Sequence, residues 1–281
     1  MLRFGYVYPV GKLLKPSRRK CSDSKLVETG RENLLRIADA LEWNHQHGIR
    51  LFRIPFETIP FSPNSSCWKK ELDVEGEVLG NYIRKKRMRL FIRLPSTCPI
   101  SSPDPAATKR GIAALEHSAA ILGLLNAGTD SKIIAQIGRI HAKRKETAKR
   151  FINSVSRLSE DARKRLVVEN DSVHWSFYDA FGLAGKLHLP IVFNYAAFMQ
   201  NHFTELSAAD TIKVNAMSWK KEDGPQKIYY SETVRGEKRK SSISKKAFLK
   251  FYGGIKGLNA DIIINTEGGG RAVLKAQEYT R

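Results

Sequence analysis

The sequence is poor in cysteine and has no long apolar run. Its three cysteines, Cys21, Cys67 and Cys98, are odd in number and widely spaced, and they form no Cys-x-x-Cys pair. This pattern argues against a disulfide framework and a structural zinc site, and it favours a reducing compartment. No apolar stretch approaches the roughly 20 residues of a membrane-spanning helix, and the N-terminal residues read as a strand, not as a signal peptide. We expect an intracellular protein, cytoplasmic or associated with a nucleoid or nucleoprotein particle, with no membrane partner.

Acidic residues are also scarce relative to basic ones. The 281 residues include 48 Lys and Arg against 28 Asp and Glu, a formal net charge of +20. Such an excess favours a polyanionic partner, because neutralising phosphates releases the counterions condensed around them. A solubilising surface is the simpler reading of the same charge. We predict nucleic acid, DNA or RNA, as the partner, alone or within a larger nucleoprotein complex, while the composition indicates no oligomeric state.

The apolar residues fall in eight short runs separated by longer segments with helical spacing. The runs are Leu2–Pro9, Arg50–Pro55, Leu90–Pro95, Ile133–Gly138, Leu166–Asp171, Pro190–Tyr195, Thr211–Ser218 and Asp261–Glu267. The helical segments are Glu28–His47, Trp68–Arg84, Pro105–Leu125, Ala142–Leu158, Val173–Leu187, Ala196–Ala209, one that opens at 242–248, and Gly269–Ala276. Such alternation predicts an α/β fold of parallel β/α units, and eight units predict a closed (β/α)8 TIM barrel. The length fits one barrel of ~250 residues with modest insertions, so residues 1–281 are expected to form a single domain.

Three connections that follow predicted strands are basic. The connection 10–26 carries Arg18, Arg19 and Lys20, the connection 219–242 carries Lys238, Arg239 and Lys240, and Arg139, Lys143, Arg144 and Lys145 follow the fourth strand. TIM barrels build their sites on the loops at the C-terminal ends of the strands. We therefore interpret the first two as basic loop insertions after strands one and seven, and all three as contacts for phosphates. The basic runs 84–89 and 163–165 precede strands, so they belong to the opposite end of the barrel.

Short motifs along the chain match one family in their order and spacing. They are Arg3-Phe4-Gly5-Tyr6, Glu32-Asn33-Leu34 with Trp43-Asn44, Gly48-Ile49, Leu51-Phe52-Arg53, Ser102-Pro103-Asp104-Pro105, Lys149-Arg150-Phe151 and Leu166-Val167-Val168-Glu169-Asn170-Asp171. In this the chain resembles the UV-damage endonuclease family almost from end to end. The resemblance implies a (β/α)8 barrel that uses several divalent cations, held by His, Asp and Glu, to cut DNA beside UV photoproducts or abasic sites.

The same resemblance implies that most of these ligands are replaced. The family's third-strand histidine falls in Arg93-Leu94-Pro95-Ser96-Thr97, and its Gln-Tyr damage probe falls on Ser96-Thr97. The other replaced ligands fall on Gln136, Asn194, Ala197, Asn215 and Asn265, and one more falls near Tyr229-Tyr230. Glu169 and Lys213 are retained, so they are the only catalytic candidates, as remnants of the family.

A pocket without metals must neutralise Glu169 in another way, because a lone buried carboxylate is costly. Arg93 and Lys213 are the natural partners, so we predict a Glu169–Arg93–Lys213 cluster at the mouth of the barrel. The cluster is either a structural hydrogen-bond network, a phosphate site together with Arg139, or a site of residual catalysis. No cofactor is expected. A relocated metal site built from Glu169, His141 and His202 is the alternative, since the other histidines fall in helical stretches.

Two weaker candidates lie at the ends of the first and eighth strands. Tyr6 is placed to stack on a base or sugar, or to pack as a barrel aromatic. Gly268-Gly269-Gly270-Arg271 precedes a helix, where free N–H groups hold anions, although three glycines also suit a plain tight turn.

Two functions from different classes follow. The first is a catalytically inactive relative of the endonucleases that binds nucleic acid through basic loops, as an accessory repair factor or as a structural component of a nucleoprotein assembly. The second is a divergent active endonuclease that incises DNA beside photoproducts or abasic sites with Mn²⁺ or another divalent metal. A sugar isomerase is compatible with the fold, but fold alone establishes no function. We favour the first, and whether the chain is an enzyme stays open.

Overall fold

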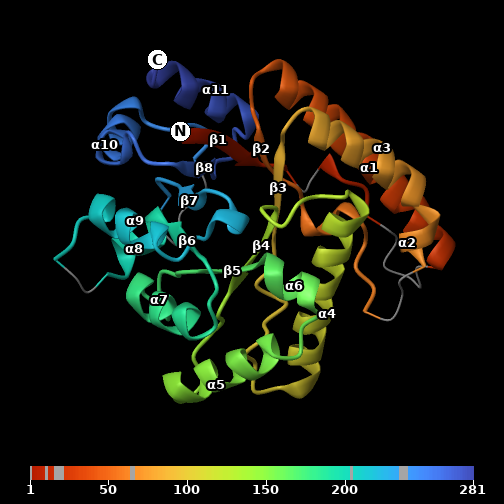
Figure 1. Ribbon diagram of the computed structural model, residues 1–281, viewed down its shortest axis with the longest axis horizontal. Coiled ribbons are helices and arrows are strands. Elements are labelled where there is room, and N and C mark those ends of the chain that lie inside the picture. The colour runs from red at the N-terminus through yellow and green to blue at the C-terminus, as the bar shows by residue number, and fades with distance from the viewer. Residues whose placement is uncertain (1, 10–11, 16–21, 64–66, 203–204, 234–239) are drawn as a thin grey trace.

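Eight parallel strands form a closed barrel in the computed structural model, and helices surround it (Figure 1). The structure describes residues 2–9, 12–15, 22–63, 67–202, 205–233 and 240–281. Within those ranges no helix is both long and apolar enough to cross a membrane. The (β/α)8 barrel predicted from the alternating pattern is confirmed.

The strands are β1 (Leu2–Val7), β2 (Leu51–Arg53), β3 (Arg89–Arg93), β4 (Lys132–Gln136), β5 (Leu166–Glu169), β6 (Ile191–Asn194), β7 (Gln226–Tyr230) and β8 (Ala260–Ile264). The helices are α1 (Asp23–Gln46), α2 (Trp68–Glu71), α3 (Asp73–Lys85), α4 (Pro105–Leu124), α5 (Arg144–Val155), α6 (Glu160–Arg165), α7 (Phe177–Lys186), α8 (Tyr195–Gln200), α9 (Ala208–Ala216), α10 (Lys245–Ile255) and α11 (Gly270–Tyr279). Two short 3-10 turns, η2 (Phe56–Thr58) and η3 (Lys221–Asp223), complete the described elements.

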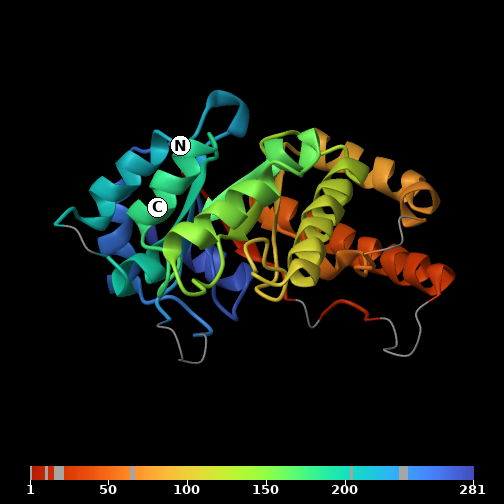
Figure 2. The same cartoon turned by 90° about the horizontal axis from the view of Figure 1, so that it is seen from below.

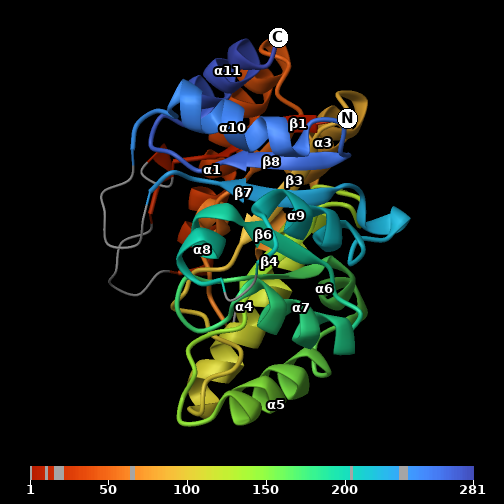
Figure 3. The same cartoon turned by 90° about the vertical axis from the view of Figure 1, so that its left-hand side faces the viewer.

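Each strand pairs with the strands that precede and follow it in the chain, and β8 pairs with β1 to close the barrel. In that closing pair Leu2 lies opposite Ala260 and Tyr6 lies opposite Ile264. Parallel neighbours cannot be joined by a tight turn, so the connections run across the outside of the barrel and carry helices. The last two helices, α10 and α11, lie side by side over β8 and β1 (Figures 1 and 3).

The side chains inside the barrel form three layers. The middle layer is apolar and takes one residue from each strand, namely Val7, Leu51, Phe91, Ile134, Val167, Val192, Tyr229 and Ile263. Because side chains alternate along a strand, residues two positions before or after these also point inward. Two positions before, Arg89, Lys132, Lys227 and Asp261 are buried at the N-terminal ends of the strands. Two positions after lies a second polar layer at the C-terminal ends, which we call the mouth layer.

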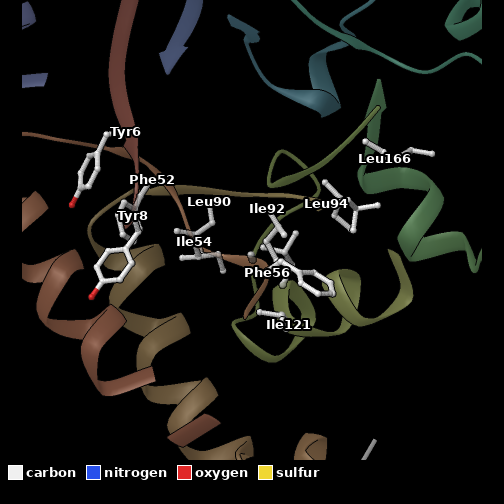
Figure 4. Packing of buried hydrophobic residues seen from close by; sticks show 14 of the residues in the cluster. Tyr6, Tyr8, Phe52, Ile54, Phe56, Leu90, Ile92, Leu94, Ile121 and Leu166 are labelled. Atoms are coloured by element: carbon white, nitrogen blue, oxygen red, sulfur yellow. The ribbon is translucent and has the colours of Figure 1, made fainter. Parts of the chain in front are cut away.

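The outward-facing side chains of the same strands pack against the helices and form the main core. Tyr6, Phe52, Leu90 and Ile92 point from β1, β2 and β3 toward this helical shell (Figure 4). Fully burying side chains of this kind stabilises the fold by about 1.5–3 kcal/mol each. The core therefore holds the strands rigidly, and it fixes the places from which the loops of the mouth start.

The seventh strand predicted at Thr211–Ser218 is wrong. Residues 208–216 form α9, whose N-cap Ser207 accepts a hydrogen bond from the backbone N–H of Asp210. The alternation of Ile212, Val214 and Ala216 imitates a strand, but the capping serine starts a helix. The strand is β7, which pairs with β6 and β8. It lies inside the segment 219–242, which was therefore wrongly predicted to be one loop insertion after the seventh strand.

Three helical predictions also need correction. The segment predicted at Ala196–Ala209 contains α8 and only the first residues of α9, and the segment Trp68–Arg84 is divided into α2 and α3. His174 lies in the connection between β5 and α7, and His188 lies in the turn after α7, so neither is in a helix. Polar residues close to helix ends explain these errors, because spacing alone places a boundary poorly.

Candidate nucleic-acid interface at the barrel mouth

The mouth layer brings together five of the residues that the resemblance singled out. It consists of Arg53, Arg93, Gln136, Glu169, Asn194, Ser231 and Asn265, each two positions beyond a residue of the apolar middle layer. Gln136 lies opposite Glu169 in the pairing of β4 with β5. Asn265 follows β8 and donates its backbone N–H to Tyr230 at 2.9 Å. Seven strand ends therefore present polar side chains around one carboxylate.

Both oxygens of that carboxylate, Glu169, are engaged. Oε2 accepts a hydrogen bond from Nε of Arg93 at 2.7 Å, and Oε1 accepts one from Nδ2 of Asn194 at 2.7 Å. The Glu169 side chain is 1% exposed and that of Arg93 is 25% exposed. Burial acts to lower the pKa of Arg93, but the charge of Glu169, the nearby Tyr229 and the hydrogen bond to Glu169 together outweigh it, so the net pKa is raised. Arg93 therefore supplies a positive charge beside the carboxylate.

Asn194 is held in place from three sides. It is the N-cap of α8, and its Oδ1 accepts a hydrogen bond from the N–H of Ala197 at 3.1 Å. Its backbone N–H donates to Oδ1 of Asn170 at 2.7 Å, and its carbonyl oxygen accepts from Nδ2 of Asn170 at 3.2 Å. With Oδ1 taken by the helix, only the amide nitrogen is left for Glu169. The capping role of Asn194 thus directs its Nδ2–H donor, not an acceptor, toward the carboxylate of Glu169.

A second arginine reaches the mouth from β2. Nη1 of Arg53 donates to the hydroxyl of Tyr229 at 3.2 Å, and Nε of Arg53 has no hydrogen-bond partner among the described residues. Burial raises the pKa of Tyr229 although Arg53 and Arg93 both act to lower it, so its hydroxyl stays protonated. The sequence reasoning missed Arg53. The alternation of Leu51 and Arg53 along one strand was the signal that could have found it.

The third member predicted for the cluster, Lys213, is elsewhere. It lies on α9 with its side chain exposed, and it pairs with Asp210 at 2.9 Å. The prediction of a Glu169–Arg93–Lys213 cluster is thus confirmed for Arg93 and wrong for Lys213, because it placed Lys213 on a strand that is a helix. Asn215 is likewise on α9, where it donates to Gln226 at 2.8 Å. The lysine that β7 does point into the barrel is Lys227, below the apolar layer, as Lys132 is on β4.

Part of the predicted basic rim is exposed, and its role as a phosphate contact stays a prediction. Arg139 and Lys143 are exposed on the connection from β4 to α5, and Lys145 is exposed in the first turn of α5. Arg144 is also half-exposed, but it forms an ion pair with Asp179 and lies over the ring of Trp175 at 5.4 Å from its centre.

Of the other two basic loops the structure describes little. Lys240 is exposed, and its Nζ lies 3.9 Å from Oε2 of Glu232. Arg18, Arg19, Lys20, Lys238 and Arg239 fall outside the described residues, and their role as phosphate contacts stays a prediction.

A pocket of ≈ 470 Å³ opens beside Gln136. Its walls come from the connections after β3, β4 and β5 and include Arg139, His141 and Asp171. Ser96 lines the same pocket, and Ser96 and Thr97, where the family has its damage probe, are both exposed. Two short hydroxyl side chains present little apolar surface to insert between base pairs. The pocket is a recess at one side of the mouth with both polar and apolar walls.

A second pocket, of ≈ 840 Å³, lies between α1 and the connection from β8 to α11. Gly268, Gly269, Gly270 and Arg271 line it, so the predicted anion-holding turn does face open space. Tyr6 also borders it but is only 5% exposed, and its ring packs against Phe52 and Trp43. Stacking of Tyr6 on a base stays a prediction that this burial disfavours.

The sequence matches one protein family along nearly its whole length. Residues 10–275 match the profile of the UV-endonuclease UvdE family. The chain belongs to this family. A UV DNA damage endonuclease of Clostridium perfringens is 29% identical over 253 residues, which are 88% of this chain and 61% of that protein. A UV-damage endonuclease of Schizosaccharomyces pombe is 26% identical over 232 residues, 76% of this chain and 38% of that protein. This UvdE-family chain thus spans less than two thirds of either relative.

Solved structures agree with the family. The crystal structure of SacUVDE superimposes with a TM-score of 0.89 at 25% sequence identity, over 99% of this chain and 97% of that one. A D-psicose 3-epimerase from Clostridium cellulolyticum superimposes with a TM-score of 0.55 at 13% identity, over 94% and 84% of the two chains. The second likeness shows the barrel fold alone.

The residues at the mouth of this UvdE-family chain do not fit a cluster of divalent cations. Hard cations such as Mn²⁺ need several carboxylate or imidazole ligands that converge. In the described part of the chain, no three His, Cys, Asp or Glu side chains converge in this way. Both oxygens of the one carboxylate in the mouth layer are already bound by Arg93 and Asn194. The alternative site of Glu169, His141 and His202 does not form, since both histidines are exposed on separate loops.

Proposed function

We propose that this UvdE-family chain binds nucleic acid at the barrel mouth and does not cut it with metal ions. The pairing of Glu169 with Arg93 and Asn194 carries the proposal. The guanidinium beside this carboxylate repels a second cation, and both oxygens already accept hydrogen bonds, so the arrangement disfavours metal binding. Arg93 is a permanent cation, because a guanidinium does not lose its proton in proteins. It thus neutralises Glu169 without any metal.

The charge around the mouth supports phosphate binding. Arg53 adds a second guanidinium to the mouth layer, and Arg139, Lys143 and Lys145 stand exposed on the rim. Arginine and lysine on loops around a concave site contact phosphates without reading sequence. The relatives are named for damage in DNA, which makes duplex DNA the proposed partner ahead of RNA. The role is that of an accessory repair factor or a structural component of a nucleoprotein assembly.

The test compares cleavage and binding on the same substrate. An end-labelled, UV-irradiated duplex is incubated with the protein and Mn²⁺, or with EDTA, and binding is followed by a gel shift. We expect no Mn²⁺-dependent cleavage and equal binding under both conditions. The double variant Arg139→Gln/Lys143→Gln should weaken binding about tenfold, since it removes two phosphate contacts. Its matched control, Lys250→Gln on the exposed side of α10, should bind like the unchanged protein.

The alternative is a divergent active endonuclease. It would show Mn²⁺-dependent incision that disappears in Glu169→Gln, and that result would overturn the proposal. Equal binding of the rim variant and its control would show that the mouth is not the contact surface. A competing RNA duplex of the same length tests the choice of DNA, because preference for RNA would contradict it.

A further inference from the structure

The end of the barrel opposite the mouth carries a cluster of arginines around two pockets. Arg3 and Arg89 belong to β1 and β3, and Arg50 and Arg87 lie immediately before β2 and in the turn before β3. Arg3, Arg87 and Arg89 line a pocket of ≈ 280 Å³, and Arg3 and Arg50 line a neighbouring pocket of ≈ 420 Å³. Because Arg3 borders both pockets, they form one surface, which we call the N-terminal face.

This face has little negative charge to balance its arginines. Asp130 is the only carboxylate side chain among the described residues that line the two pockets. Neither Arg3 nor Arg87 forms an ion pair with a described residue, whereas Arg50 donates to the carbonyl oxygen of Lys86. By contrast, the pocket beside α1 at the mouth is lined by both Asp39 and Glu267. The N-terminal face therefore has more unbalanced positive charge in its recesses than the mouth pocket.

One of the arginines is fixed by the interior of the barrel. Arg89 is 5% exposed, and its Nη2 donates to Asp261, which is itself 3.6 Å from Nζ of Lys227. Nε of Arg89 is buried and has no hydrogen-bond partner among the described residues. Burial lowers the pKa of Arg89, and the nearby charge of Arg3 acts in the same direction. An anion in the pocket between Arg3 and Arg89 would remove this repulsion.

Arg87 has a backbone conformation that glycine or asparagine adopts more easily than arginine does. Its φ is 51°, in the left-handed region, at the turn where the N–H of Arg87 reaches Arg84 and the N–H of Met88 reaches Ile83. This is the C-terminal position of a helix that glycine or asparagine adopts most easily. The chain instead places an exposed arginine there, with a backbone strain of roughly 1 kcal/mol or more.

We propose that the N-terminal face is a second phosphate-binding surface, which contacts a nucleic-acid backbone at the end of the barrel opposite the mouth. Two adjoining pockets that share Arg3 suit the repeated phosphates of a strand better than one small anion. The exposed side chains of Arg84, Lys85, Arg163 and Lys164 extend the positive charge beyond the pockets, since they also precede β3 and β5. The barrel then holds nucleic acid at both ends and bridges two segments.

The experiment measures bridging directly. A duplex is tethered to beads, the protein is added, and a second, fluorescent duplex is captured and counted. The variant of the N-terminal face is Arg3→Gln/Arg87→Asn, in which asparagine accepts the left-handed backbone. The mouth variant is Arg139→Gln/Lys143→Gln, and the control is Lys250→Gln/Lys275→Gln on the exposed faces of α10 and α11. Arg87→Asn alone is the second variant, because it leaves the half-buried Arg3 unchanged.

We expect the unchanged protein and the control to capture the second duplex. The N-terminal-face variant should capture at least fivefold less, and the slope of log K against log[salt] should become shallower by about 1.8, or 0.9 per lost phosphate contact. Arg87→Asn alone should show half of this change in slope. Capture and slope that equal those of the control would overturn the proposal.

Failure of the proposed function and failure of this inference give different results. If the mouth variant binds normally while the N-terminal-face variant loses binding, the proposed function is wrong and the N-terminal face is the main contact. If the N-terminal-face variant binds and bridges duplexes normally but no longer sediments with phosphatidylserine vesicles, the surface belongs to a membrane and this inference is wrong.

Discussion

Glu169 shows how neighbouring side chains determine what a buried carboxylate can do. Its carboxylate is buried at the end of β5, where it would be costly without a partner. Arg93 and Asn194 provide the partners from β3 and from the cap of α8. The guanidinium of Arg93 and the amide of Asn194 therefore neutralise and orient the carboxylate of Glu169.

This pairing predicts a strong energetic coupling between Glu169 and Arg93. Arg93→Met leaves a buried carboxylate with one amide donor and should cost about 3–5 kcal/mol of unfolding free energy. Glu169→Gln should cost less, about 2 kcal/mol, because Arg93 is partly exposed to water. The double variant should cost at least 1 kcal/mol less than the sum of the single variants in urea unfolding. Simple additivity would show that the two side chains do not depend on each other.

Lys213 supplies a control residue for the unfolding experiments on Glu169 and Arg93. Its ion pair with Asp210 is exposed and spans three residues of one helix, so Lys213→Ala should change stability by less than about 0.5 kcal/mol. A larger loss would mean that Lys213 contacts the mouth after all.

At the scale of the elements, the sequence predicted strand positions best where one strand follows one helix with a clear boundary. The strands that end at Arg93, Gln136 and Glu169 were located correctly, because they are buried apolar runs, but each predicted run extended two residues too far. β7 was missed, because Gln226 and Lys227 read as loop residues although both are buried, Lys227 inside the barrel and Gln226 against α9. Propensity cannot foresee that Asp261 of another strand supplies the counter-charge for Lys227. The error moved Lys213 and Asn215 into a site to which they do not belong.

Helix α4 carries a buried histidine whose titration should be visible in stability. His117 donates its Nε2–H to the carbonyl oxygen of Ile59 at 3.0 Å and is enclosed by Phe56, Phe61 and Trp68. Burial lowers the pKa of His117 to about 4 from 6.5. Between these values the unfolded chain binds a proton that the folded chain does not, so stability falls as the pH falls from 6.5 to 4.

His117→Gln isolates this effect, because glutamine can still donate to Ile59 and does not titrate. Relative to that variant, the unchanged protein should lose up to about 3 kcal/mol of unfolding free energy between pH 6.5 and pH 4. Urea unfolding at several pH values measures the difference. If the difference in unfolding free energy between the two proteins does not change with pH, His117 is exposed to water in the folded chain.

At the scale of the whole molecule, the net charge of +20 should govern binding to any duplex. Fluorescence anisotropy at 50 to 200 mM salt should give a linear fall of log K with log[salt], with a slope of about −0.9 for each phosphate contacted. If both ends of the barrel bind, one long duplex can contact only one end at a time, whereas two short duplexes can contact both. The salt slope measured with the long duplex should then be smaller than the slope measured with two short ones. Binding that does not respond to salt would contradict an interface made of phosphates.

The closing pair of strands has a consequence for how the chain is made. β1 finds one of its two neighbours only when β8 has been synthesised, roughly 250 residues later, and at 5–20 residues per second that takes roughly 13–50 s. Throughout translation one edge of β1 is therefore an unpaired template, and unpaired edges invite other chains to add to them. The barrel can close only after β8 has been synthesised, so until then the newly made chain has the greatest need of chaperones.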